Sequence, residues 1–113
     1  MGDTARLAGD YDRAEFAYKT ALRRFSSPPD RVVFLLGKIE LDQHKNPAAA
    51  AKWFETYLQR FEHGQLRREA SGLLLVSRIE SGDNAGARAA ATSYLQSFPD
   101  GPHASKARAV LGH

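Results

Sequence analysis

Cysteine is absent from this chain of 113 residues, which excludes disulfides, thiolate nucleophiles, iron–sulfur clusters and cysteine-based zinc sites. Long apolar runs are absent too. The longest covers residues 32–36, whereas a bilayer-spanning helix needs roughly 20 apolar residues, so we expect no direct membrane insertion. Residues 1–13 carry acidic side chains and no apolar stretch, and they therefore predict neither a signal peptide nor a lipoprotein leader.

A basic tract is also missing. The 16 lysines and arginines and the 13 acidic residues give a formal charge of +3, and both signs are spread along the chain. This even distribution argues against nucleic acid as a partner. A hydrophobic fraction of 42% and a charged fraction of 26% are typical of a globular protein, and the length suits one domain with one core.

Catalytic and phosphate-binding motifs are missing as well. The sequence has no Gly-x-Ser-x-Gly elbow, no Gly-x-x-x-x-Gly-Lys-Ser/Thr loop and no acid pair that recurs in an apolar setting. We therefore expect no enzyme activity, and no catalytic, cofactor-binding or metal site. Four histidines lie at expected helix ends or turns without partners at metal-ligand spacing, and we interpret them as solvated turn residues. They are His44, His63, His103 and His113.

The sequence does contain an internal repeat. Three segments of seventeen residues, 9–25, 45–61 and 82–98, superpose without a gap at offsets of 36 and 37. Small and apolar residues recur three and four apart within each segment, which indicates a helix with one buried stripe. Three sets of identical residues share repeat positions: Ala14, Ala50 and Ala87; Leu22, Leu58 and Leu95; and Phe25, Phe61 and Phe98.

The stretches between these segments also have a helical period, and none alternates long enough to be a strand. One helix hairpin cannot bury its apolar face alone, so neighbouring hairpins must stack. The sequence therefore predicts an all-α, right-handed α-solenoid, with Tyr57 and Tyr94, which share one repeat position, in its core. About seven helices are expected, at 3–8, 12–25, 30–44, 47–62, 65–81, 84–97 and 102–112.

The segment GDYDRAEFAYKTAL, residues 9–22, resembles the turn and second helix of a tetratricopeptide repeat (TPR), a helix hairpin of about 34 residues. Leu36-Gly37 and Leu111-Gly112 resemble the leucine-glycine pair of that family's first helix. Two features depart from the family pattern. Leu74-Leu75 stands where leucine-glycine is expected, and the second repeat has one extra residue before its turn at Lys45.

This resemblance implies that residues 1–113 form a single TPR-like domain. Its expected parts are a partial repeat at 1–28, repeats at 29–63 and 64–99, and a terminal helix or partial repeat at 100–113. The ending YLQSFPDGPHASKARAVLG is similar to a narrower group, the TPR proteins of the bacterial cell envelope, such as the Tol-Pal system coordinator and the lipoprotein partners of the outer-membrane barrel assembly machine. That likeness implies a periplasmic or envelope-associated location.

The TPR resemblance also implies that the first helices line a concave groove that binds a peptide. Apolar side chains flanked by cations would suit a partner with hydrophobic anchors and acidic flanks. The alternative is that Phe34, Leu41 and Ile79 pack against adjacent first helices, because buried apolar side chains are commoner than exposed anchors. The expected groove residues are Arg31, Phe34, Lys38, Leu41, Val76, Ile79 and Lys106.

Three functional hypotheses follow. The first is a non-enzymatic scaffold that binds a protein or peptide through the groove, in a bacterial envelope or regulatory assembly. The second is a homodimerisation module that pairs through exposed terminal helices, unless Ala107, Val110 and Leu111 pack on the third repeat as a cap. The third, RNA binding by a helical repeat, is disfavoured by the even charge distribution.

Overall fold

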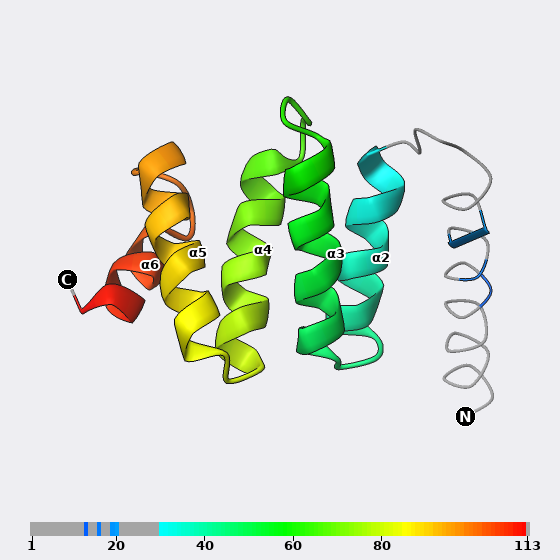
Figure 1. The fold of residues 1–113 in the computed structure, drawn as a ribbon, viewed down its shortest axis with the longest axis horizontal. Helices are drawn as coiled ribbons and strands as arrows, with labels where there is room; N and C mark the ends of the chain where they lie inside the picture. Colours follow the sequence, from blue (N-terminus) through cyan, green and yellow to red (C-terminus); the bar gives the residue numbers. More distant parts are fainter. Residues whose placement is uncertain (1–12, 14–15, 17–18, 21–29, 113) are drawn as a thin grey trace.

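In the computed structural model, residues 13, 16, 19–20 and 30–112 are described. Residues 30–112 form five α-helices and no strand (Figure 1). The helices are α2 (Asp30–Asp42), α3 (Pro47–Arg60), α4 (Arg67–Glu80), α5 (Asn84–Ser97) and α6 (Ala104–Leu111).

The all-α prediction is confirmed for residues 30–112, and the five predicted helices in that range agree with the observed bounds to within two residues. The predicted helix at 3–8, most of the one at 12–25 and most of the partial repeat at 1–28 lie outside the described residues. The structure therefore supports five of the seven expected helices over their full length.

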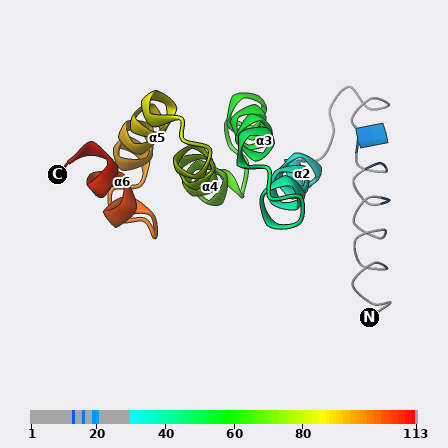
Figure 2. The same ribbon diagram turned by 90° about the horizontal axis from the view of Figure 1, so that it is seen from below.

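The helices form two layers. Each one packs against the next in the chain, and the chain alternates between the layers (Figure 2). Helices α2, α4 and α6 lie in one layer, whereas α3 and α5 lie in the other. The first helix of every described hairpin is thus on the same side of the protein.

Helix starts follow the capping residues in the sequence. Asn46 accepts a hydrogen bond from the amide of Ala49 at 3.2 Å, and Asp83 accepts one from the amide of Gly86 at 2.9 Å. The extra residue of the second repeat is accommodated in the turn before α3. Lys45, which follows the extra residue and stands at the register position of Gly82, has a φ of 53° and is the single non-glycine residue with positive φ in the described part of the chain.

The repeated residues line the core wherever the structure describes them. Tyr57 and Tyr94 are buried, which confirms their predicted place, and so are Ala50 and Ala87. The repeated leucines and phenylalanines are half-buried and pack against the edge of the same cluster; they are Leu58, Leu95, Phe61 and Phe98.

Helix α6 covers the end of this core. Ala107 is fully buried, and Val110 and Leu111 are half-buried against the core cluster. The three residues thus pack on the third repeat as a cap. Pairing through the terminal helices was expected only if these residues did not pack in this way.

Leu75 departs from the family pattern because it is large where the family has glycine. A small residue on the next helix offsets this extra volume. A Cβ atom at Gly37 would lie 2.6 Å from the ring of Phe54, so this pair combines the smallest residue with a large one. In the next repeat Leu75 takes the position of Gly37, and Ala91 takes that of Phe54. All four residues are buried. Each hairpin thus places one large and one small residue at these two positions.

A tyrosine hydroxyl joins the second helix of each described repeat to the following first helix. Tyr57 accepts a hydrogen bond from the amide of Leu66 at 2.9 Å, and Tyr94 accepts one from the amide of His103 at 3.0 Å. The hydroxyl of Tyr57 also donates to a carboxylate oxygen of Asp30 at 2.7 Å, which ties α3 to the start of α2.

His103 is not the solvated turn residue that we expected. It is half-buried before α6, and its ring meets the ring of Tyr94 edge-on with centroids 5.8 Å apart. The ring also lies against Gly72 on α4, where a Cβ atom would collide with the imidazole. The imidazole fits there because position 72 is a glycine. The burial of His103 therefore depends on a residue in another helix and not on the turn.

We expect acid to weaken the fold through His103. Burial, and secondarily the nearby charge of Lys106, lower the pKa of His103 below its usual 6.5. The unfolded chain then binds the proton more tightly, so stability is complete above pH 6.5 and decreases as the pH falls below it. Urea unfolding at about pH 7.5 and about pH 5.5 measures this.

The matched variant is His103→Leu, which installs the residue found at the equivalent position, Leu66. It should show a smaller loss of stability between the two pH values than the parent protein. An equal loss in the two proteins would contradict this account of His103.

Candidate functional site

The layer of α2, α4 and α6 carries all seven residues expected in the groove. Arg31 near the start of α2 and Lys106 on α6 are exposed. Lys38 contacts the carboxylate of Asp42 at 3.0 Å, with the side chains 41% and 46% exposed. A surface pair of this kind contributes at most about 1 kcal/mol, so Lys38 can exchange Asp42 for a partner's carboxylate at little cost.

Two of the expected groove residues serve the packing of the helices. Phe34 lies half-buried with its ring centroid 5.7 Å from that of Phe54 and 6.3 Å from that of Tyr57. Leu41 is likewise half-buried against the core cluster. Phe34 thus packs against the second helix α3, whereas the alternative placed it against an adjacent first helix.

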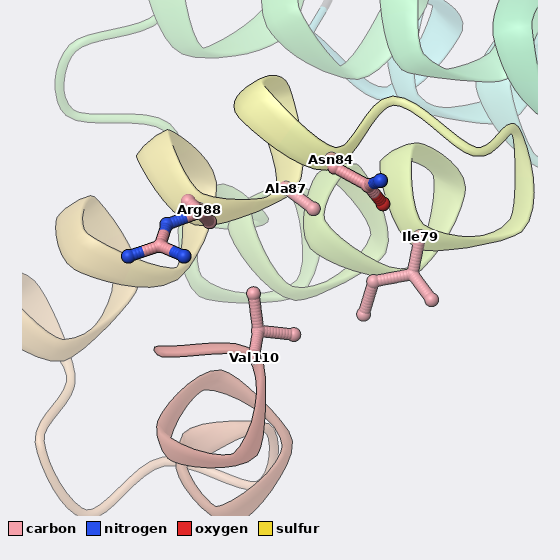
Figure 3. Close-up of a pocket in the computed structure, with 5 residues that line it drawn as sticks. All are labelled: Ile79, Asn84, Ala87, Arg88 and Val110. Carbon is pink, nitrogen blue, oxygen red and sulfur yellow. The ribbon is translucent and has the colours of Figure 1, made fainter. Parts of the chain in front are cut away.

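The apolar surface that α4 offers is nearer its C-terminal end. Val76 is half-buried, whereas Ile79 is 38% exposed. Beside Ile79 lies a cavity of about 350 Å³ between α4, α5 and α6. Figure 3 shows the lining side chains, with Ile79 and Arg88 on opposite sides and with Ala87 and Val110 between them; the fifth is Asn84.

Sequence reasoning missed Arg88 and Asn84 as site residues. A signal for Arg88 was present in the repeat register, because Arg88 stands at the position of Ala51 in the preceding repeat. Ala51 is buried and Arg88 is exposed. A charged residue at the register position of a buried alanine indicates that the two repeats have different surroundings there.

Arg78 reaches from α4 toward the other layer, where its side chain lies in the crevice between α3 and α5. Its guanidinium donates to the carboxylate of Glu55 at 3.1 Å and to the carbonyl of Gly86 at 3.2 Å. The Arg78 side chain is 18% exposed. The paired cation thus links α4 to α3 through Glu55 and to α5 through Gly86.

Other classes of site have no support in the described part of the chain. No group of three or more histidine, aspartate or glutamate side chains there could hold a metal ion. Of the helices at 30–112, none has the length and apolar character needed to cross a membrane.

Stacked helix hairpins with one shared core define a helical-repeat protein. Residues 1–64, more than half of the chain, match the tetratricopeptide repeat family, and the chain belongs to that family. Such repeats generally mediate protein–protein interaction and are typically not catalytic. No curated protein and no solved structure matches the chain.

Proposed function

We propose that the chain is a non-enzymatic scaffold that binds a protein or peptide segment along α2, α4 and α6, wound as a right-handed α-solenoid. The observation that carries this proposal is the placement of the three first helices in one layer (Figure 2). The exposed side chains of these helices include Arg31, Ile79 and Lys106. A segment lying across that layer would contact three helices at once.

The chemistry of these side chains suggests the partner's chemistry. Arg31 and Lys106 are cations on α2 and α6, and Val76 and Ile79 supply aliphatic surface on α4 between them. A segment with aliphatic anchors and acidic flanks complements this arrangement. The likeness of residues 94–112 to envelope TPR proteins favours a bacterial envelope or regulatory assembly as the setting.

Charge reversal on the two layers tests the proposal. In a crosslinking pull-down from the native cell, Arg31→Glu combined with Lys106→Glu should reduce partner recovery roughly tenfold, because rim charges set encounter rate and selectivity. The matched control reverses two exposed cations of α3, Lys52→Glu combined with Arg60→Glu, and should retain recovery.

Circular dichroism and thermal melts must show that both double variants fold. Equal recovery by the two variants, or a greater loss with the α3 variant, would place the binding surface elsewhere.

A further inference from the structure

The loop before α6 repeats the loop before α4 in its backbone contacts but differs from it in its side chains. In both loops a glycine amide donates to a phenylalanine carbonyl at 3.0 Å, and a tyrosine hydroxyl accepts from the amide of the residue that precedes the helix. Leu66 and Glu69 at the start of α4 correspond to His103 and Lys106 at the start of α6. A titratable base and a cation thus replace an apolar residue and an anion on an equivalent backbone.

His103 and Lys106 form one cluster in the first-helix layer. A spacing of three residues at the start of a helix places two side chains on the same face. The imidazole lies against Gly72 of α4, and Lys106 is exposed on α6. Burial, and after it the positive charge of Lys106, lowers the pKa of His103 below 6.5, so the two groups are close enough to interact.

Within the described residues this cluster has no anionic partner. Neither side chain forms an ion pair there, and the ring of His103 has its edge-on contact with Tyr94 but no hydrogen bond. A leucine, as at position 66, would serve the packing equally well. The histidine and the lysine therefore present a charge pattern that the fold itself does not balance.

The neighbouring elements do not supply the missing anion. Their charged and titratable side chains nearest the imidazole in the chain are Arg68 and Glu69 of α4, Tyr94 of α5, Asp100 of the loop, and Lys106 and Arg108 of α6. Arg68 and Glu69 approach each other at 3.9 Å, and Arg108 donates to the carbonyl of Pro99 at 2.8 Å. After burial, Lys106 is the one member of this set that shifts the pKa of His103. A proton on His103 therefore adds a second cation beside Lys106.

We infer that an aspartate or glutamate of the bound segment supplies this anion, pairing with Lys106 and with the imidazole of His103, which takes up a proton as the segment binds. The inference rests on the proposed function and adds a means of regulation to it. The carboxylate cancels the repulsion from Lys106 and attracts the imidazolium, so the pKa of His103 rises in the complex. Proton and partner then favour each other's binding, and affinity increases as the pH falls toward the pKa of His103.

An NMR titration of the His103 ring tests the electrostatic step without any partner. Lys106→Gln removes the cation, and Lys106→Glu places a carboxylate where the partner's carboxylate would lie. The pKa of His103 should be lowest in the parent protein, higher in Lys106→Gln and highest in Lys106→Glu. His103→Phe identifies the resonance by its loss. The same pKa in all three proteins would overturn the inference.

A pull-down from native-cell lysate at about pH 7.5 and about pH 6 tests the coupling to binding. His103→Phe keeps a ring against Gly72 and cannot take up a proton. Between the two pH values, the parent should gain roughly threefold in partner recovery relative to His103→Phe, which is the scale of one exposed ion pair. If His103→Phe does not fold, as judged by circular dichroism, His103→Leu takes its place.

The matched control is His63→Gln, which changes an exposed histidine in the loop before α4 and should gain as much as the parent. Equal pH dependence in the parent and His103→Phe would remove this inference alone if Arg31→Glu combined with Lys106→Glu still lowers recovery. If that charge reversal leaves recovery unchanged, the proposed function fails and this inference falls with it. The pKa order among the Lys106 variants requires no partner and so separates the two failures.

Discussion

Phe54→Ala should lower the free energy of unfolding by about 4 kcal/mol, because it empties the centre of the buried aromatic cluster. Phe54 is fully buried, and its ring lies against Gly37 of α2 and 5.7 Å from the ring of Phe34. Gly37→Leu should cost about 3 kcal/mol, since the new side chain would collide with Phe54. Urea unfolding followed by circular dichroism measures both.

The double variant tests whether the two side chains share one space, so that a larger one can replace a smaller one, or whether each substitution destabilises the fold independently. Gly37→Leu combined with Phe54→Ala reproduces the pair found as Leu75 and Ala91 in the next repeat. We expect it to be at least about 2 kcal/mol more stable than the sum of the single effects predicts. Additive costs would show that the two positions do not share one space, and would remove our explanation of Leu75.

Tyr57→Phe should cost about 2–3 kcal/mol, more than the matched change Tyr94→Phe, for which we expect about 1 kcal/mol. The Tyr57 hydroxyl accepts from the Leu66 amide and donates to Asp30, whereas that of Tyr94 has one hydrogen bond, from the amide of His103, within the described residues. Loss of the first hydroxyl leaves a partly buried amide and a carboxylate without their partner. Equal costs for the two variants would contradict this difference.

The same tyrosine should be recognisable in an alkaline titration. Burial, together with the hydrogen bond to Asp30, raises the pKa of Tyr57 from 10.0 to about 12. Because the folded pKa exceeds the unfolded one, this contribution to stability is complete below pH 10 and is lost as the pH rises toward 12. Tyrosinate absorbance should therefore include a group that titrates near pH 12, and Tyr57→Phe should remove it.

The repeat register predicted most of the fold because it combines two independent constraints. The spacing of Ala50, Phe54 and Tyr57 marks one helix face, and its recurrence 37 residues later indicates a repeated hairpin whose helices each pack on their neighbours in the chain. Capping residues such as Asn46 and Asp83 then locate the helix starts. The capping signals are local and the spacing of the helix face is periodic. Both can be read directly from a sequence.

The candidate site was less predictable because it depends on differences between the repeats. Phe34 has the spacing of a second apolar face, and only the fold shows that it packs against the rings of α3. His103 is half-buried because Gly72, in another helix, leaves space for it. The cavity at Arg88 is lined by residues of α4, α5 and α6. Each feature is a contact between residues far apart in sequence.

The chain's own lysines allow the most direct test of the central claim, that partners bind on the first-helix layer. Lys38 lies on α2 and Lys106 on α6, whereas Lys52 lies on α3 in the other layer. After lysine-directed crosslinking in the native cell, mass spectrometry should find partner peptides attached to Lys38 and Lys106, with little at Lys52. Partner crosslinks concentrated at Lys52 would contradict the account.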